Sequence, residues 1–133
     1  MEEPQKSLAN ETLSCVGATL WIDNESDLDA VTALSGSGPA YFYYLMESMI
    51  EAGISLGLSE QQSKQLTLST AVGSAKLVAQ SELDPAKLRE AVTSKGGTTE
   101  AAINTLNESN VKEIIISAIK NAEERSRELS KSN

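Results

Sequence analysis

From residue 27 onward, the apolar residues of this chain recur at spacings of three and four, the period that lines one face of an α-helix. A longer segment of this kind begins near Pro39 and ends near Gly57. Its apolar stripe consists of Phe42, Leu45, Met46, Met49, Ile50, Gly53 and Ile54. Glycine or proline interrupts the pattern repeatedly, so the helices have defined ends. The sequence therefore predicts an all-α bundle of about six helices over residues 27–133.

Helix start signals divide the region after residue 57. Residues 59–62 (SEQQ) match a capping box, in which a serine precedes a glutamine by three positions. Residues 84–85 (DP) supply an N-cap and a proline at the first helical position of a short helix, which should reach about Thr93. Asn110 is expected to cap the last helix, with Glu113 at its third position.

Residues 1–26 have a different pattern. A short helical piece is expected at residues 7–15, and Gly17 should break it. Residues 18–22 (ATLWI) have the composition of a β-strand and are followed by a polar turn. A lone strand lacks hydrogen-bonding partners and is not stable by itself. We therefore expect this segment to be the tail of a sheet whose other strands are not in this chain.

Composition limits the chemistry that the chain can perform. The 133 residues are 40% hydrophobic and 23% charged, which suits one soluble globular domain. A formal net charge of −8 argues against nucleic acid and anionic membranes as partners. There is no histidine, which excludes Ser-His-Asp and Cys-His catalysis and most zinc sites, so no metal site is expected.

The cysteine content and the N-terminal sequence indicate the compartment in which the chain is expected. Cys15 is the single cysteine, so there is no internal disulfide, and a reducing compartment such as the cytoplasm is expected. No apolar run approaches the roughly 20 residues that span a bilayer. The N-terminus (MEEPQK) is acidic and polar, which is not the pattern of a signal peptide.

A polar, glycine-rich loop at residues 93–99 (TSKGGTT) separates two segments predicted to be helical. Free backbone N–H groups and the dipole at the start of the second helix favour a small anion such as a carboxylate. Gly96 and Gly97 let that anion approach closely, Lys95 adds a positive charge, and Thr98 and Thr99 add hydroxyls. The alternative is that the run only ends one helix and begins the next.

A second glycine-rich run, residues 35–39 (SGSGP), begins like a dinucleotide-binding fingerprint. The match fails because the third glycine would fall on Tyr41, and because no second strand ending in an acid follows about 20 residues later. The run is better explained as a helix N-terminus, with Ser37 or Gly38 as N-cap and Pro39 at the first helical position. This helix start could also face a ligand.

Four of the chain's five aromatic residues are consecutive, at residues 41–44 (YFYY). On one helix they point to every side, so contact with a single core leaves some of them exposed. Protein on more than one side would bury the rest, and tyrosine is enriched at interfaces. The alternatives are therefore a protein interface, or a large core with a few exposed tyrosines.

Two long motifs resemble those of one family. Residues 29–41 (DAVTALSGSGPAY) closely resemble the start of the C-terminal domain of pyrroline-5-carboxylate reductase. A second motif is similar to the signature of that family: Pro85-x-x-Leu88-x-x-x-Val92-Thr93-Ser94-x-Gly96-Gly97-x-Thr99-x-x-Ala102-Ile103-x-x-Leu106. The motifs stand in the right order and at the expected separation, and the resemblance covers about residues 13–130.

The resemblance implies an enzyme that reduces 1-pyrroline-5-carboxylate to L-proline, the last step of proline biosynthesis, with NADPH or NADH. In that family an N-terminal Rossmann domain holds the cofactor, and a C-terminal helical domain interlocks with its twin in a homodimer that can assemble further. Residues 1–26 would then be the tail of the cofactor domain, including the orphan strand. Residues 27–133 would be the helical dimerisation and substrate domain.

The Rossmann domain and its glycine fingerprint are not in this chain. Met1 precedes what resembles mid-domain sequence, so we expect a fragment that is inactive without its cofactor domain. The alternative is a non-catalytic helical dimerisation module with a natural start at Met1. A segment of about 150 residues with a GxGxxG motif upstream of residue 1 would distinguish the first from the second.

The resemblance also assigns substrate-binding residues. Gly97 and Thr98 would offer backbone N–H groups to the substrate carboxylate. Thr99 would offer its N–H to the carboxylate and its hydroxyl to the ring nitrogen. Ser94 would shape the same pocket, and Glu25 aligns with a position that reaches the substrate in some members. No residue is assigned a catalytic role.

Gly38 and Pro39 would lie near the nicotinamide of the cofactor, by the same resemblance. Lys95 is a departure, because the family often has proline at that position. This replacement would loosen the loop and add a positive charge. The acid-rich turn before Leu28 is variable and matches the family poorly.

Overall fold

The computed structural model describes residues 3–131 and places them in helices joined by short connections. The helices are α1 (Glu3–Ser14), α2 (Leu28–Val31), α3 (Gly38–Ser55), α4 (Glu60–Gln80), α5 (Pro85–Ala91), α6 (Thr98–Glu108) and α7 (Val111–Lys131). A 3₁₀ turn η1 (Glu25–Asp27) precedes α2, and a π-helical turn η2 (Thr32–Gly36) follows it. No strand occurs within residues 3–131, and the all-α expectation is confirmed.

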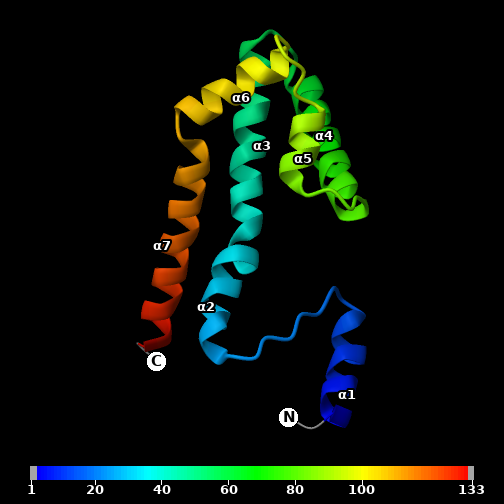
Figure 1. Cartoon of the computed structure of the whole chain (residues 1–133), viewed down its shortest axis with the longest axis vertical. Coiled ribbons are helices and arrows are strands. Elements are labelled where there is room, and N and C mark those ends of the chain that lie inside the picture. Colours follow the sequence, from blue (N-terminus) through cyan, green and yellow to red (C-terminus); the bar gives the residue numbers. More distant parts are fainter. Residues whose placement is uncertain (1–2, 132–133) are drawn as a thin grey trace.

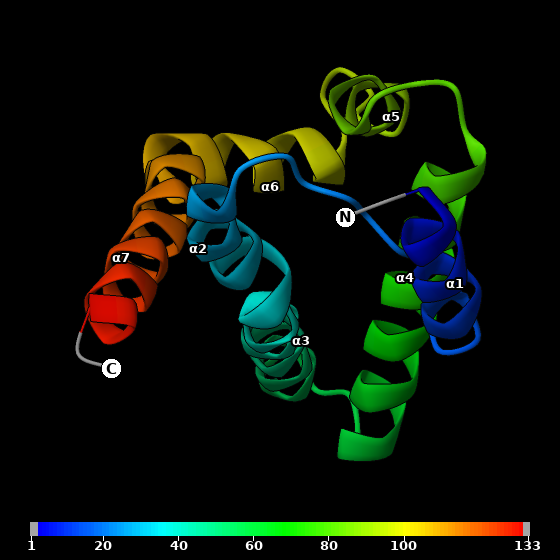
Figure 2. The same cartoon turned by 90° about the horizontal axis from the view of Figure 1, so that it is seen from below.

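The helices open outward around α3. In two perpendicular views, α7 and α4 lie on opposite sides of α3, and α6 crosses from the α4–α5 side toward α7 (Figures 1 and 2). Helix α4 packs against α3, while α7 packs against α2, η2 and α6. Helix α1 stands apart, at the end of an extended connection (Figure 1). Within residues 3–131, no helix is long and apolar enough to cross a membrane.

The predicted start and stop signals act as expected in the middle of the chain. Helix α3 ends at Ser55, and Gly57 follows with φ +97°, a conformation that favours glycine. At α4, the Ser59 hydroxyl accepts from the Gln62 N–H at 3.2 Å, and the Ser59 N–H donates to the Gln62 side chain at 2.9 Å. At α5, the Asp84 carboxylate accepts from the Lys87 N–H at 2.9 Å. The capping prediction is confirmed at both helices.

Asn110 differs from its expected role. It stands immediately before α7, and its carbonyl accepts from the Ile114 N–H at 3.1 Å. Its φ is +53°, whereas an N-cap residue is ordinarily extended. This left-handed conformation terminates α6, and asparagine is one of the few residues with a side chain that adopts it readily. One residue therefore ends one helix and begins the next.

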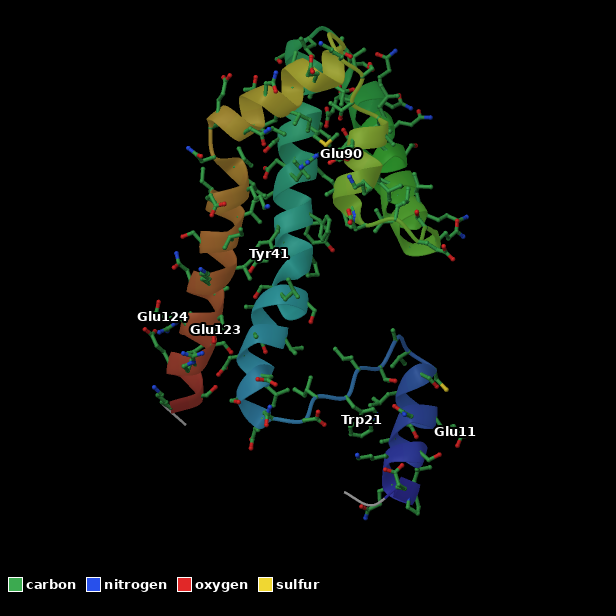
Figure 3. All side chains as sticks on the ribbon, in the orientation of Figure 1. Glu11, Trp21, Tyr41, Glu90, Glu123 and Glu124 are labelled. Atoms are coloured by element: carbon green, nitrogen blue, oxygen red, sulfur yellow. The ribbon has the colours of Figure 1, made fainter. Side chains whose placement is uncertain are left out.

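The strand expected at residues 18–22 is not formed. The segment is extended and mostly exposed, and the described residues offer no second strand to pair with it. It is held instead by the Asn10 side chain, whose oxygen accepts from the Thr19 hydroxyl at 3.0 Å and from the Trp21 ring N–H at 2.8 Å. Trp21 therefore lies beside α1 (Figure 3). The expectation of a strand was therefore wrong, because a strand needs a hydrogen-bonded partner and the described residues offer none.

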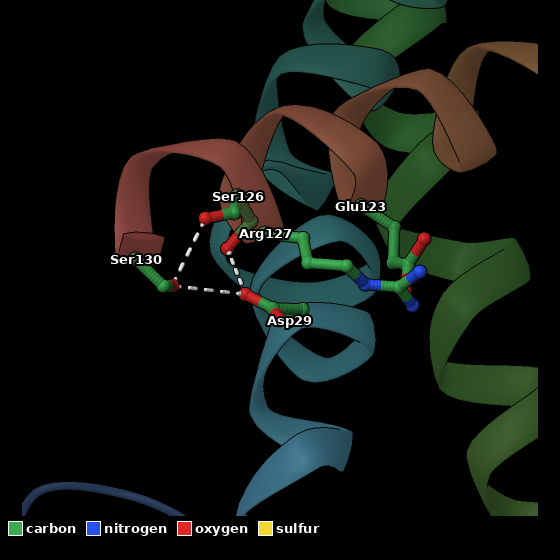
Figure 4. Close-up of polar contacts among 5 residues, drawn as sticks. All are labelled: Asp29, Glu123, Ser126, Arg127 and Ser130. Carbon is green, nitrogen blue, oxygen red and sulfur yellow. Dashed lines mark hydrogen bonds and ion pairs between the residues drawn. The ribbon is translucent and has the colours of Figure 1, made fainter. Parts of the chain in front are cut away.

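The beginning and end of the helical region meet in a polar clasp, defined as Asp29, Ser126 and Ser130 (Figure 4). The Asp29 carboxylate on α2 accepts from the Ser126 hydroxyl on α7 at 2.7 Å, and from the Ser130 hydroxyl at 3.4 Å. An ion pair between Arg127 and Glu123 lies on the same part of α7. The clasp therefore joins the last turns of α7 to α2.

The chain buries very little of itself. Its accessible surface is 10960 Å², whereas a folded monomer of 14.2 kDa exposes about 6,800 Å². Among the described residues, Ala33 is the only buried hydrophobic side chain, and the buried polar ones are Ser63 and Thr67. The apolar faces of α3, α4 and α7 are therefore largely open in the single chain.

The tightest helix contact is that of α3 with α4. A Cβ atom on Gly53 would lie 2.6 Å from the Ser63 hydroxyl and 3.0 Å from the Ser63 Cβ. We expect Gly53→Ala to lower the free energy of unfolding by about 1–3 kcal/mol, because the added methyl group forces the two helices apart. Denaturant unfolding followed by circular dichroism measures this change.

Gly73→Ala is the matched control. Gly73 also lies inside a helix, but nothing stands within 4 Å of its Cβ position. Alanine there removes backbone entropy from the unfolded chain and should stabilise the protein by up to about 1 kcal/mol. Equal effects of the two substitutions would contradict the close α3–α4 contact.

Candidate functional site

The loop between α5 and α6 is a closed turn. Helix α5 ends at Ala91, and the Thr93 N–H and hydroxyl donate back to carbonyls of that helix at 3.0 Å and 2.6 Å. The Gly97 N–H then donates to the Ser94 carbonyl at 3.0 Å. Gly96 has φ +75° at the third position of this four-residue turn, where a positive φ calls for glycine. The sequence TSKGG therefore fixes the chain direction just before α6.

The start of α6 is open. Its N-cap is Gly97, which has no side chain to cap the helix, and its carbonyl accepts from the Ala101 N–H at 3.2 Å. Within residues 3–131, no acceptor is bonded to the backbone N–H groups of Thr98, Thr99 and Glu100. By contrast, α4 and α5 cap themselves with their own serine and aspartate side chains. The α6 start thus presents free donors at the positive end of a helix dipole.

Ser94 packs directly against Gly97. A Cβ atom on Gly97 would lie 2.7 Å from the Ser94 hydroxyl and 3.1 Å from the Ser94 carbonyl oxygen. A side chain at this position would displace Ser94, so the close packing favours glycine even though a φ of −85° is available to any residue. The structure brings Ser94, Gly97, Thr98 and Thr99 together in one turn of chain.

The Gly97 N–H was expected to donate to the substrate carboxylate, but in this loop it has a partner within the chain. It already donates to the Ser94 carbonyl, so it is not free to reach a ligand. Of the expected backbone donors, those of Thr98 and Thr99 remain open. Gly97 instead leaves room for Ser94, because it has no side chain, and it occupies the N-cap position of α6.

Two charged residues belong to the loop. Lys95 is exposed and forms no ion pair within the part of the chain that the structure describes. The Glu100 carboxylate, in the first turn of α6, accepts from the Gly96 N–H at 2.7 Å. Sequence reasoning missed this contact, although the signal was present: Glu100 stands three residues after the N-cap, as in a capping box.

The remaining expected site residues lie elsewhere in the chain. Glu25 begins η1 at the lower end of the molecule, whereas the loop before α6 lies at the upper end (Figure 1). Gly38, which is buried, and Pro39 start α3 and lie well below the loop (Figure 1). A single chain therefore does not bring Glu25, Gly38 or Pro39 to the open start of α6.

The run at residues 35–39 does not form a dinucleotide cradle. The Ser37 N–H donates to the Thr32 carbonyl at 2.8 Å within a π turn, and the Tyr41 hydroxyl donates to the Ala33 carbonyl at 3.0 Å. Tyr41 points from α3 toward α7 (Figure 3). Helical backbone thus stands where that fingerprint needs a strand. The described residues do not fit a nicotinamide dinucleotide as a self-contained binding fold.

The family model for pyrroline-5-carboxylate reductase dimerisation matches residues 25–129. The chain belongs to this family. The pyrroline-5-carboxylate reductase of Pseudomonas aeruginosa is 50% identical over 121 residues, which are 91% of this chain and 44% of that protein. The recognised resemblance is therefore confirmed.

Solved structures agree with this assignment. A pyrroline-5-carboxylate reductase from Coxiella burnetii superposes with a TM-score of 0.93 at 40% identity, covering 97% of this chain and 48% of that one. The Plasmodium falciparum pyrroline carboxylate reductase, solved with NADP bound, superposes with a TM-score of 0.87 at 35% identity, covering 95% and 48%. The chain spans less than half the length of each of these relatives.

The contact between Ser94 and Gly97 gives a direct test of the loop. Gly97→Ala should push Ser94 aside and shift the backbone amide resonances of residues 94–100 in a ¹H–¹⁵N spectrum of the chain, because the added carbon meets two Ser94 oxygens. In Gly73→Ala, by contrast, the resonances of the loop should stay in place. A Gly97→Ala spectrum that changes only at residue 97 would contradict this geometry.

Proposed function

We propose that this chain is the substrate-binding and dimerisation part of a reductase that converts 1-pyrroline-5-carboxylate to L-proline with NADPH or NADH. The observation that carries the proposal is the uncapped start of α6, with its free amides, in a chain of the reductase family. Residues 27–133 form the helical domain in this proposal. Residues 1–26 are the end of the cofactor domain.

The substrate carboxylate is bound by backbone donors at the α6 start. The Thr98 and Thr99 N–H groups point out of the first helical turn, where the helix dipole favours an anion. Lys95 adds a positive charge to a chain whose formal net charge is −8. The Thr99 hydroxyl is assigned to the ring nitrogen of the substrate, and Ser94 shapes the pocket through its contact with Gly97.

The absence of histidine is compatible with this reaction. A protonated cyclic imine already has an electrophilic carbon, so the protein needs to supply orientation more than proton transfer. Residues of the loop hold the carboxylate and the nitrogen, which fixes two points of a small ring. Binding of the dinucleotide is assigned to the Rossmann domain that the family resemblance implies, with Gly38 and Pro39 beside the nicotinamide.

A second copy of the chain is the proposed partner, because one copy exposes far more surface than a folded monomer of this size. Two apolar grooves flank α3. One is lined by α3, α4 and α5, and includes Met46, Leu68 and Val78. The other is lined by α3, α6 and α7, and includes Tyr44 and Ile115. Helices of a second copy would fill both grooves.

A dimer also resolves the separation of the expected site residues. The 3₁₀ turn η1, which Glu25 begins, lies near the lower end of the molecule, and the start of α3, which Gly38 and Pro39 form, lies between η1 and the loop before α6 at the upper end (Figure 1). A second copy that runs in the opposite direction would place the loop of one protomer against the α3 start of its partner. The complete substrate site is therefore proposed to form between two chains.

Tyr43 and Tyr44 test the dimer as a matched pair. In the single chain they are 67% and 74% exposed, but Tyr44 lines the groove between α3 and α7, whereas Tyr43 lines neither groove. We expect Tyr44→Asp to reduce the solution mass from a dimer toward the 14.2 kDa monomer, because it places a charge in an apolar interface. Tyr43→Asp should leave the dimer intact. A wild-type chain that is monomeric at micromolar concentration would contradict the proposal.

Thr99 tests the substrate site. The complete protein that contains this chain should oxidise NADPH in the presence of 1-pyrroline-5-carboxylate. In that protein, Thr99→Ala should raise the substrate KM and lower kcat/KM by about tenfold, the effect of losing one hydrogen bond to a bound substrate. The KM for NADPH should not change.

Thr105→Ala is the control for this measurement. Thr105 lies on the same helix, and among the described residues its hydroxyl donates to the Ala101 carbonyl alone, at 3.2 Å. Unchanged kinetics in Thr99→Ala would remove Thr99 from the site. No NADPH oxidation by the complete protein would favour the alternative of a non-catalytic dimerisation module.

A further inference from the structure

Glu100 makes a contact that the proposed function does not use. It is the third residue of α6, it is half-buried, and its carboxylate accepts from the Gly96 N–H at 2.7 Å. A hydrogen bond to an ionised group is shorter and stronger than one between neutral groups. The contact reaches back four residues, from the helix into the turn that precedes it.

The capping box of α4 shows what is unusual about this contact. There the Gln62 side chain accepts from the N–H of the N-cap residue, Ser59, at 2.9 Å. In α6 the N–H of the N-cap residue, Gly97, already donates to the Ser94 carbonyl at 3.0 Å. Glu100 therefore bonds one residue further back, to Gly96. The serine hydroxyl that caps α4 has no counterpart on Gly97, so the amides of α6 stay open.

The two bonds together determine which amides of the loop are available. The Gly96 N–H is taken by Glu100 and the Gly97 N–H by Ser94, whereas those of Thr98 and Thr99 have no acceptor within the described residues. Two adjacent glycines have wide conformational freedom, and φ at Gly96 is +75°. The hydrogen bond from the Gly96 N–H to the Glu100 carboxylate restrains the backbone at this glycine.

We propose that Glu100 is a positioning residue: its carboxylate holds the Gly96 N–H and so keeps the loop in the conformation that leaves the Thr98 and Thr99 amides open to the substrate carboxylate. The inference rests on the proposed function of this loop. Glu100 does not touch the substrate in this arrangement. It acts through the backbone of Gly96 and the turn that leads into α6.

Two substitutions separate the hydrogen bond from the charge. Glu100→Gln keeps a side-chain oxygen at the same reach, so it should retain the bond to Gly96 and leave kinetics within about twofold of wild type. Glu100→Ala removes the acceptor, and in the complete protein it should raise the KM for 1-pyrroline-5-carboxylate about fivefold, the effect of roughly one net hydrogen bond. The kcat value and the KM for NADPH should stay within about twofold, since the reacting groups are unchanged.

Glu113→Ala is the matched control variant. Glu113 is also the third residue of its helix, α7, and it is exposed. Removing it deletes the same charge at the same place relative to a helix dipole, so dipole effects on folding are equal. The substrate KM of Glu113→Ala should match wild type. If Glu100→Gln behaves like Glu100→Ala, the effect comes from charge and the positioning role is wrong.

The loop itself gives a second, independent readout in the present chain. The Gly96 amide should be protected from hydrogen exchange in wild type and in Glu100→Gln, and should lose that protection in Glu100→Ala. An unprotected Gly96 amide in wild type would overturn the proposal. So would a normal substrate KM in Glu100→Ala once the Gly96 protection is lost. The Thr99→Ala result separates the positioning role of Glu100 from the substrate site itself. If Thr99→Ala raises the substrate KM and Glu100→Ala leaves it unchanged, only the positioning role is rejected. If neither substitution changes the substrate KM, the substrate site is rejected.

Discussion

A lack of internal burial governs this structure. Folding must offset the conformational entropy of every ordered residue, and apolar burial is the main favourable contribution. The single chain exposes 10960 Å², which exceeds the value for a compact monomer by about 4,000 Å². Apolar grooves lie on both sides of α3, and the proposed second copy would fill them. This open surface supports the proposed association with a second copy, and the chain belongs to a family described by its dimerisation.

Turn chemistry explains the other main feature, the open start of α6. Helices α4 and α5 begin with side chains that cap them, whereas α6 begins with a glycine. The packing of Ser94 favours that glycine, because a Cβ atom there would lie 2.7 Å from the Ser94 hydroxyl. The same packing that shapes the turn therefore also leaves the helix uncapped. The free backbone amides at the start of α6 therefore follow from local geometry alone.

Local signals in the sequence predicted most of the helix boundaries, because capping residues, Gly57 and Pro85 act over a few residues only. The expected strand at residues 18–22 did not form because a strand depends on a partner, and residues 3–131 offer none. The residues expected in the loop lie together because they are contiguous in the sequence. The separation of Glu25 and Gly38 from that loop could not be predicted, because it depends on how α3 and α7 are arranged in space (Figure 1).

The clasp of Asp29 with Ser126 has a consequence for the order of folding. These residues are 97 positions apart, and closing a flexible loop of that length costs about 4 kcal/mol. One hydrogen bond contributes about 0.5–3 kcal/mol, so the clasp cannot close an unfolded chain by itself. It can form only after the intervening helices have shortened the path between its two ends. The last turns of α7 are therefore expected to dock against α2 late in folding.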